Sequence, residues 1–182
     1  PDAARGCDGD GGTPCPDLVT TYTYEPNFQL LQTSTDARGH TITRAHDPQG
    51  NLVQVDFPAV TIGPAAPQAA VENWTYNGWG QPLTFTDTEG NVTQYEYYTS
   101  GPATGYRQRI TRDSGGLDVS TAYGYDAVGN VTAITVSLSI RTAYVFNDLN
   151  QVVKKTRAAG TALDYETLYW YDGNDNLVRR DV

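Results

Sequence analysis

Two histidines and several aspartates are the residues of this chain with metal-binding potential. His40 and His46 lie six positions apart, with Asp36 and Asp47 close to them in the sequence. Imidazole nitrogens and carboxylate oxygens are common ligands of zinc. All four residues, however, fall at positions of a repeated motif described below, and the motif accounts for them without a metal. We therefore expect neither a metal site nor a cofactor.

The two cysteines, Cys7 and Cys15, lie in the segment GCDGDGGTPCP near the start of the chain. A disulfide between them would close a small local loop and would indicate an oxidising compartment. The alternative is two free thiols in a flexible leader. No further ligands lie nearby at the spacing of a zinc site. Residues Asp8–Gly12 resemble the start of a calcium loop, but the distal glutamate of an EF-hand is missing.

Pairs of carboxylates are the residue types that general acid and base chemistry uses. Asp87 with Glu89, and Asp172 with Asp175, are examples. They are turn residues that we expect to be solvated, and glycosidase chemistry depends on carboxylate separation in space rather than in sequence. The chain has no nucleophile-elbow motif, and neither cysteine has a local histidine partner. The sequence therefore predicts a protein that is not an enzyme.

Composition and charge exclude some classes of binding partner. The net charge is −9 and the pI is about 4.5, and the only basic runs are Lys154–Lys155 and Arg179–Arg180. Nucleic-acid binding needs clustered Lys and Arg, so we expect no nucleic-acid partner. No apolar run approaches the roughly 18 residues of a membrane span. Because the chain starts at Pro1 rather than Met, we expect it to be processed or cut from a longer protein.

One motif recurs along the chain and organises most of it. It consists of an aromatic residue, Thr or His, then an Asx, two free positions, a glycine, an amide and an apolar residue. The Asx side chain can accept hydrogen bonds from backbone N–H groups just ahead of it. The glycine permits the positive φ with which a type I turn returns to a strand, and Asn150 and Asp175, which replace it in two copies, tolerate the same conformation. The eight copies begin at Tyr24, Thr35, His46, Tyr76, Thr86, Tyr125, Phe146 and Tyr171.

Each copy is interpreted as a hairpin turn between two short strands. Alternating segments such as VTAITV (131–136) have the strand pattern, and Thr, Val and Tyr suit a half-buried pleated surface. Cross-strand tyrosine pairs are expected along one face of the sheet. The residues predicted to build the turns are Tyr76, Asn77, Gly80, Asp87, Gly90, Asn91, Tyr125, Asp126, Gly129, Asn130, Tyr171 and Asp172.

The predicted fold is all-β, an array of tandem antiparallel hairpins in one curved sheet. A single hairpin cannot bury its apolar side alone, so the stability of such an array depends on neighbouring hairpins. We expect a leader over 1–20, the array over 21–182, and insertions near 57–73, 98–110 and 157–166.

The stretches YNGWGQPLTFTDTEGNVTQYEYY and YDAVGNVTAIT closely resemble the YD repeats of the Rhs family, which teneurins and the shell-forming subunits of insecticidal toxin complexes share. The resemblance covers Thr21 to Val182. It implies a long sheet that spirals into a hollow shell. In toxin systems such a shell encloses a toxic polypeptide, and in teneurins it is part of a cell-surface adhesion protein.

Family members commonly have more repeats than this chain, so we expect an arc of shell rather than a closed one. Rhs shells of toxin systems also end in a self-cleaving aspartyl protease marked by paired DPxG motifs. Only Asp47–Gly50 matches that motif here, inside an ordinary repeat. The protease activity is therefore not expected.

The functional hypothesis is a non-enzymatic wall segment of an extracellular or cell-surface protein that encloses or displays a toxin or another partner. The alternative is an adhesin or carbohydrate-binding module that uses exposed aromatic residues, above all Trp79 and Trp170, with Trp74 as a third candidate. These tryptophans could instead pack between hairpins. An enzyme is the remote third hypothesis. Unpaired strand edges also predict pairing with further YD repeats of the same or other chains, including an edge-to-edge homo-oligomer.

Overall fold

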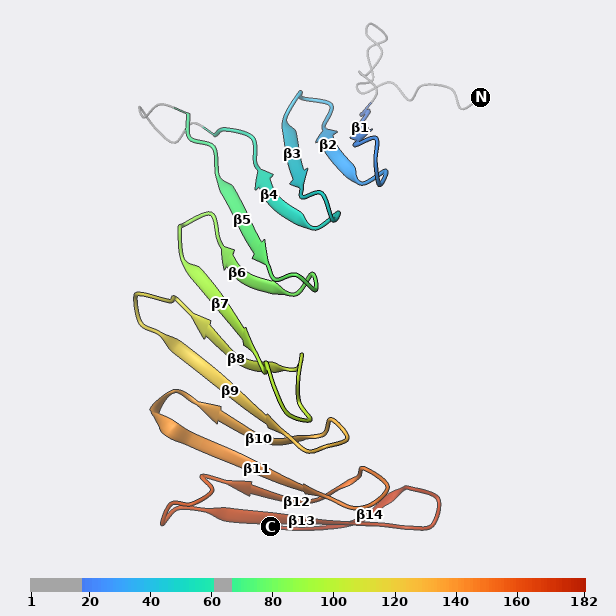
Figure 1. The fold of residues 1–182 in the computed structure, drawn as a ribbon, viewed down its shortest axis with the longest axis vertical. Coiled ribbons are helices and arrows are strands. Elements are labelled where there is room, and N and C mark those ends of the chain that lie inside the picture. Colours follow the sequence, from blue (N-terminus) through green and yellow to red (C-terminus); the bar gives the residue numbers. More distant parts are fainter. Residues whose placement is uncertain (1–17, 61–66) are drawn as a thin grey trace, which may run out of the picture. The chain divides into compact units, whose positions relative to one another are not determined.

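The computed structural model describes residues 18–60 and 67–182. Figure 1 shows that the described chain folds into antiparallel strands joined by short connections. Cys7 and Cys15, the predicted disulfide and most of the predicted leader lie outside the described residues. Within the described residues, the first strand starts at Thr21.

The strands follow one another in the sheet in the same order as in the sequence, from β1 to β14. The described residues contain no α-helix, and their single helical segment is the 3-10 turn η1 (Ser137–Ser139). The prediction of an all-β array of tandem antiparallel hairpins is confirmed. The strands are β1 (Thr21–Tyr24), β2 (Leu31–Thr35), β3 (Thr41–His46), β4 (Leu52–Asp56), β5 (Val71–Tyr76), β6 (Pro82–Thr86), β7 (Val92–Tyr97), β8 (Arg107–Arg112), β9 (Val119–Tyr125), β10 (Val131–Val136), β11 (Ile140–Phe146), β12 (Val152–Arg157), β13 (Tyr165–Tyr171) and β14 (Leu177–Asp181).

The chain divides into two compact units, and the division falls within β5. Unit 1 ends at Trp74, and unit 2 runs from Thr75 to Val182. Each unit is described by itself below.

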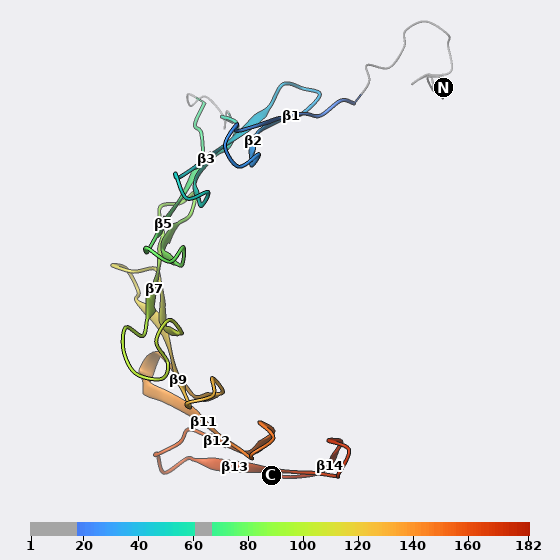
Figure 2. The same cartoon turned by 45° about the vertical axis from the view of Figure 1, so that its right-hand side comes forward.

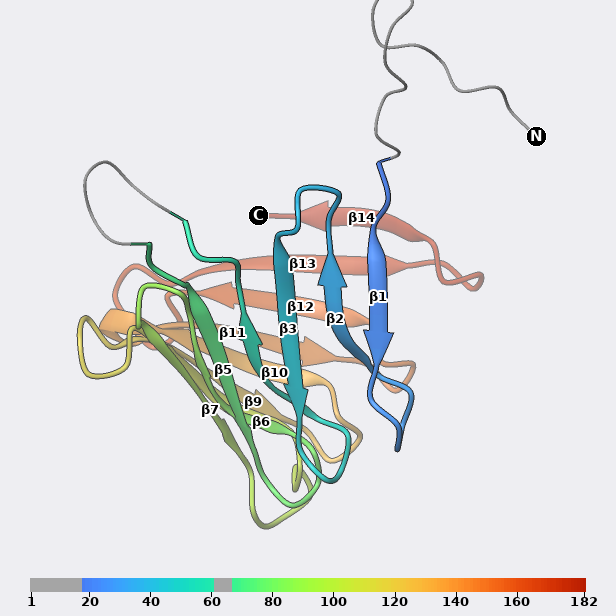
Figure 3. The same cartoon turned by 90° about the horizontal axis from the view of Figure 1, so that it is seen from above.

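Threonines line one face of unit 1. Strands β1, β2 and β3 lie side by side, as Figure 3 shows, and each carries two threonines separated by one residue. Antiparallel pairing sets these threonines opposite one another, and their hydroxyls bond across the strands, as in Thr23–Thr33 at 2.6 Å and Thr35–Thr41 at 2.8 Å. Such cross-strand pairs hold the register of a polar face.

Unit 2 is a single layer of strands with two unlike faces, and Figure 2 shows this layer without a second one packed on it. Successive residues of a strand point to opposite faces. On one face, Tyr95 is aligned with Ile110, and Tyr123 with Ile134; we call it the aromatic face. The other, which we call the polar face, aligns residues such as Gln94, Thr111 and Ser120.

A one-layer sheet buries very few side chains. Val55 in unit 1 and Ile110 in unit 2 are the buried hydrophobic residues of the described part of the chain. Two threonines of unit 2, Thr156 and Thr167, are buried to a similar degree. Most strand residues are only half-buried. Stability therefore depends on backbone ladders and on contacts between neighbouring hairpins rather than on a central core.

The eight motif copies occupy eight of the thirteen connections between strands. Two other connections were not predicted as turns. Between β8 and β9, Asp113 and Asp118 adopt positive φ, and the carboxylate of each accepts a backbone N–H inside the loop. Between β10 and β11, Leu138 and Ser139 adopt positive φ. The remaining three connections lie within or beside the predicted insertions: 57–70, 98–106 and 158–164.

Candidate functional site

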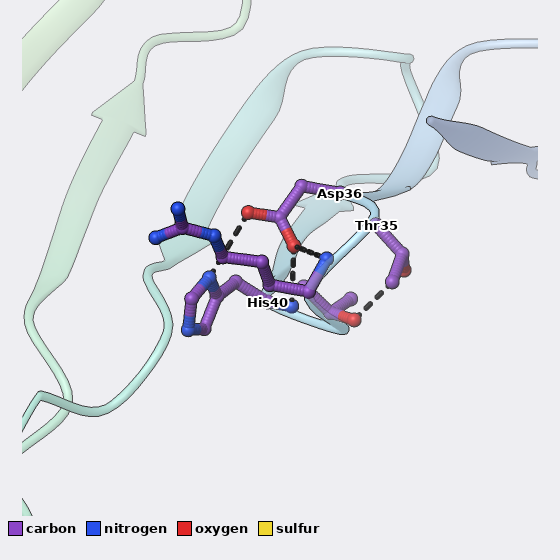
Figure 4. Close-up of polar contacts among 5 residues, drawn as sticks. Thr35, Asp36 and His40 are labelled. Atoms are coloured by element: carbon purple, nitrogen blue, oxygen red, sulfur yellow. Dashed lines mark hydrogen bonds and ion pairs between the residues drawn. The ribbon is translucent and has the colours of Figure 1, made fainter. Parts of the chain in front are cut away.

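The turn around Asp36 shows how the motif works (Figure 4). The backbone N–H of Asp36 donates to the carbonyl of His40 at 3.0 Å, and the N–H of Gly39 donates to the carbonyl of Asp36 at 3.0 Å. Oδ1 of Asp36 accepts the N–H groups of Arg38 at 2.8 Å and His40 at 2.9 Å. Oδ2 lies 3.0 Å from Nδ1 of His40. One carboxylate therefore accepts two backbone donors of the turn, and backbone carbonyls accept those of Asp36 and Gly39.

Seven of the eight copies share this geometry, in two chemical versions. An aspartate at the second motif position faces a donor at the sixth, as in Asp87 with Asn91, whose Nδ2 donates to Oδ2 at 2.9 Å. An asparagine at the second position instead faces a glutamine, and Nδ2 of Asn147 donates to Oε1 of Gln151 at 2.7 Å. In both versions the second residue presents one oxygen to the backbone. Its remaining group is an acceptor in aspartate and a donor in asparagine, so the residue at the sixth position supplies the complementary group. The seven second-position residues are Asp36, Asp47, Asn77, Asp87, Asp126, Asn147 and Asp172.

The first copy differs in length and in its capping residue. Glu25 replaces the Asx. The residue with positive φ is Gln29, at 56°, which lies one position later than in the other copies. The carboxylate of Glu25 accepts the N–H groups of Asn27, Phe28 and Leu30 at 2.7, 2.5 and 3.2 Å. The extra methylene of glutamate lets its carboxylate reach the donors of a turn that is one residue longer.

The fifth motif position adopts the left-handed conformation in all seven copies that share this geometry, which we call the standard copies. Its φ is 87° at Gly90, 61° at Asn150 and 66° at Asp175. A residue with a Cβ is strained there, and Asn and Asp are the non-glycine residues that tolerate it best.

Hydrogen bonds within the turns lower the pKa of the capping aspartates. For Asp87 and Asp126 the main cause is the side-chain amide of the asparagine four positions later, with backbone N–H donors adding to it and desolvation opposing it. For Asp36 the main cause is the hydrogen bond with His40. These carboxylates are held in the ionised form, which makes them acceptors for the turn.

The four residues considered for metal binding lie in two different turns. Asp36 and His40 bond to each other, whereas Asp47 accepts hydrogen bonds from Gln49 and Asn51, and His46 ends β3. Within residues 18–60 and 67–182, no three His, Cys, Asp or Glu side chains gather closely enough to hold a metal ion.

The carboxylate pairs considered for acid and base chemistry also have turn roles. Asp87 and Asp172 cap their turns. Asp175 accepts Nε2 of Gln151 at 3.0 Å, so it links two turns. The side chain of Glu89 is exposed.

In unit 2, the turns at one end of the sheet are linked to one another. Because strands alternate in direction, the connections after β5, β7, β9, β11 and β13 lie at the same end. Amide side chains at the sixth motif position reach the next turn at that end. We call the resulting series the turn ladder: Gln81 Nε2 to Gly105 O at 2.8 Å, Asn130 Nδ2 to Asn150 Oδ1 at 2.8 Å, and Gln151 Nε2 to Asp175 Oδ1 at 3.0 Å.

One link of the turn ladder is a packing contact. Tyr106, in the connection after β7, lies over Gly129, in the turn after β9, where an added Cβ would stand 2.8 Å from the tyrosine Oη. Gly129 also has a φ of 98°. The positive φ favours glycine at this position, and a side chain there would have to displace the ring of Tyr106.

Tyrosine hydroxyls at the ends of three strands make hydrogen bonds to the preceding strand, and the three bonds share one arrangement. Tyr97, Tyr125 and Tyr171 each end a strand of unit 2, and each donates to the carbonyl of the first residue of the preceding strand. We call these contacts tyrosine bridges: Tyr97 to Pro82 at 2.9 Å, Tyr125 to Arg107 at 3.0 Å, and Tyr171 to Val152 at 2.9 Å. Phe146, the corresponding residue of β11, has no hydroxyl.

Neither the turn ladder nor the tyrosine bridges were predicted. The signal was nonetheless present, because the sixth motif position is always an amide or histidine and the first is often tyrosine. A hairpin viewed alone offers these side chains no partner, since the partner lies about twenty residues away.

The two tryptophans considered for ligand binding lie apart. Trp79 is in the turn between β5 and β6, with 73% of its surface exposed. Trp170 is in β13 on the polar face, where the guanidinium of Arg179 lies 4.7 Å from its ring centroid. Trp74 is half-buried in β5. Trp79 is therefore the most exposed ring of the three, and Trp170 is partly exposed, at 37%.

A different group of aromatic residues gathers at the connection between β7 and β8. The ring centroids of Tyr98 and Tyr125 lie 6.2 Å apart in an edge-to-face arrangement, and those of Tyr106 and Tyr125 lie 5.0 Å apart. Tyr106 and Tyr125 border a cavity of about 310 Å³ that Tyr97, Arg107 and two glycines also line. A larger cavity, of about 500 Å³, lies in unit 1 between the turns around Glu25 and Asp47.

No family model matches this chain, and no curated protein matches it. Solved structures do match. The Photorhabdus luminescens Tc holotoxin pore gives a TM-score of 0.67 at 23% identity over 90% of this chain. The crystal structures of TcdB2-TccC3-TEV and TcdB2-TccC3-Cdc42 give TM-scores of 0.66 and 0.64 at 24% and 22% identity, over the same share of this chain.

The fold of this chain is thus one that occurs in the TcdB2-TccC3 proteins of Tc toxins. The chain spans only 9% of the length of the matched chains. Within the described residues there is no helix of the length and apolar character needed to cross a bilayer.

Proposed function

We propose that this chain is a wall segment of an extracellular or cell-surface Rhs-type shell, and that its role is structural. The wall encloses or displays a partner, for which a toxic polypeptide is the first candidate. Further YD repeats continue the sheet on either side. The capping carboxylates serve the turns rather than a reaction.

The observation that carries this proposal is the single layer of strands in chain order, on which no second layer of described residues packs. A wall between two compartments needs two surfaces and no thick core, and an array of hairpins supplies both. Support also comes from the fold match over 90% of the chain to components of Tc toxins.

Electron cryomicroscopy of the protein encoded by the full reading frame tests the proposal. The expected result is a continuous sheet of YD repeats that surrounds enclosed density, together with a segment that trypsin cuts only after the sheet is unfolded. A sheet that encloses nothing, with every segment cut at the same rate in the folded protein, would overturn the shell.

A second candidate function is glycan binding by an adhesin, and the exposure of Trp79 is the observation that favours it. Trp79→Ala should abolish binding on a glycan array if this ring stacks on sugar. Leu149→Ala is the matched control, since Leu149 occupies the same motif position and is also exposed. Equal loss in both variants, or no binding by the unmodified chain, argues against this function.

A further inference from the structure

We infer that the cavity beside the β7–β8 connection is a binding site for a sugar ring that carries a carboxylate, such as a uronic or sialic acid residue. The connection spans 98–106 and is the one member of the turn ladder that does not have the repeat motif. A connection that departs from a repeated turn is where a function can be added without disturbing the array. The inference is independent of the shell proposal and of Trp79.

The cavity has aromatic walls that the local fold holds in place. Tyr125, which lines the cavity, donates its hydroxyl to the carbonyl of Arg107. Tyr98 packs edge-to-face against Tyr125 from outside the lining, and its hydroxyl donates to the carbonyl of Tyr123 at 2.8 Å. The ring of Tyr106 is tilted by 59° against that of Tyr125. Tyr106 itself is 42% exposed, so one ring of the cluster remains free for contact from outside.

The charge at the cavity is positive. Arg107 lines it, and its guanidinium lies 5.2 Å from the ring centroid of Tyr95. Among the described residues, the ion pairs involve His40, Lys154 and Arg179, so Arg107 has no carboxylate partner there. A guanidinium binds a carboxylate with two parallel hydrogen bonds. An acidic ligand would therefore give the Arg107 guanidinium the carboxylate partner that it lacks among the described residues.

The shape and exposure of the cavity favour a sugar over an apolar aromatic acid. The volume of about 310 Å³ suits a single ring with its substituents. Both Tyr106 and Arg107 are exposed, so a bound ring would keep much of its surface in water. A sugar places its apolar face on a tyrosine ring and leaves its hydroxyls solvated or bonded to the Tyr106 hydroxyl, whereas an aromatic acid gains less in so open a site.

Gly129 fixes the position of the exposed ring. A Cβ at this residue would come within 2.8 Å of Oη and 3.2 Å of Cε2 of Tyr106. A side chain at position 129 would push the ring of Tyr106 away from the neighbouring turn at the edge of the cavity. Substitution of Gly129 should therefore damage the site without removing any group that contacts the ligand.

The test is NMR titration of the 182-residue chain with methyl glucuronide, with N-acetylneuraminic acid and with methyl glucoside as the neutral control. We expect both acids to shift the resonances of Tyr106 and Arg107, and the neutral sugar to bind at least about tenfold more weakly. Arg107→Gln and Tyr106→Ala should each weaken binding of the acids by about tenfold or more, because each removes a direct contact.

Arg141→Gln is the matched control, since Arg141 is an exposed arginine in the same unit on the polar face. It should leave the affinity unchanged, and thermal melting should show that all variants fold. Tighter binding of benzoate than of the glucuronide, equal binding of neutral and acidic sugars, or no binding at all would each overturn the inference. None of these outcomes bears on the shell, which the trypsin and microscopy experiments test separately.

Discussion

A single side-chain oxygen organises each turn of this protein. In the seven standard copies, the second motif residue accepts the backbone N–H groups two and four positions later, as Asp126 does at 3.1 and 2.8 Å. The residue in the left-handed conformation then returns the chain to the next strand. Aspartate and asparagine are equally able to play this part because both expose one oxygen at the same distance from the backbone.

Loss of that oxygen should destabilise the protein measurably. Asp87→Ala removes the acceptor of two backbone N–H groups in the β6–β7 turn. We expect a fall in Tm of roughly 2–4 °C, the shift typical of one lost local interaction in a protein of this size. Glu89→Ala is the control in the same turn, because its side chain is exposed, and it should melt like the unmodified chain. Equal melting of both variants would contradict the capping role.

The lowered pKa of the capping aspartates predicts sensitivity to acid. A carboxylate whose pKa is lower in the folded state than its ordinary value of 3.8 stabilises fully above that value and progressively loses the effect as pH falls through the folded pKa. Tm should therefore be flat from neutral pH down to about pH 5 and should fall below about pH 4. Thermal melts between pH 7 and pH 2 measure this.

A matched variant separates the turns from other acid effects. Asp87→Asn combined with Asn91→Gln converts one turn to the version already present at Asn77 and Asn147. That turn no longer titrates, so the acid-induced fall in Tm should be smaller than in the unmodified chain. An unchanged fall would mean that other groups cause the sensitivity.

The residue-scale chemistry could be predicted from the sequence because it is local. The capping Asx and the left-handed glycine depend on residues within five positions of each other. The version with Glu25 could not be predicted in the same way, since its turn is one residue longer and shifts the positive φ to Gln29. Neither could the pairing of Asp with Asn and of Asn with Gln, which requires the side chains to be placed in space.

At the scale of strands and turns, the tyrosine bridges tie the ends of β7, β9 and β13 to the preceding strand. Tyr171→Phe should lower the free energy of unfolding by about 0.5–1.5 kcal/mol, the usual contribution of one hydrogen bond. Tyr169→Phe in the same strand is the control, because the Tyr169 hydroxyl makes no hydrogen bond within the described residues. Urea unfolding measures both. A larger loss in the control than in Tyr171→Phe would contradict the role of the bridge.

The turn ladder predicts energetic coupling between turns that are distant in the sequence. Gln151 and Asp175 belong to successive turns and share a hydrogen bond of 3.0 Å. Their single alanine substitutions should therefore be non-additive, with an interaction of at least about 0.5 kcal/mol in a double-mutant cycle. Gln151→Ala paired with Asp87→Ala supplies the control within unit 2, since the side-chain hydrogen bonds of Asp87 lie within its own turn, and this pair should be additive. Additivity in both cycles would mean that the ladder bond contributes nothing.

Strand positions were predictable where the motif marks their ends, and less so elsewhere. The turns at Asp113–Asp118 and Leu138–Ser139 lack the motif and reach positive φ with aspartate, leucine and serine. Leucine has no local polar group to signal such a turn, and its conformation follows from the alignment of β10 with β11. Here the pairing of the flanking strands outweighs the preference of the turn residues for negative φ.

At the scale of the whole molecule, the outermost strands of the sheet are open to pairing. Among the described strands, β1 and β14 each have a neighbour on one side only, and Leu177 and Val178 in β14 are exposed. We expect the isolated chain to associate edge to edge with increasing concentration. Light scattering should show species larger than 19.8 kDa. Val178→Lys should reduce this association, whereas a clean monomer of the unmodified chain at high concentration would contradict it.

The presence of the sheet and a face that carries tyrosines were predictable, but the cross-strand partners were not, since Tyr95 is aligned with Ile110 and Tyr123 with Ile134 rather than with other tyrosines. Short alternating strands indicate that one side is more apolar, yet they do not say whether another layer covers it. The cluster around Tyr106 also needed coordinates, because its residues come from β7, the following connection, β9 and the next turn. The curvature, the domain boundaries and the roles of the site residues remain predictions.

The spacing of the turn ladder restricts how such a protein can change length during evolution. Each rung joins one turn to the next at the same end of the sheet, two strands and 20 or 24 residues further on. Gain or loss of one strand would send every later turn to the opposite end and exchange the aromatic and polar sides beyond that point. Duplications and deletions should therefore survive in steps of a whole hairpin, so that the array grows by even numbers of strands.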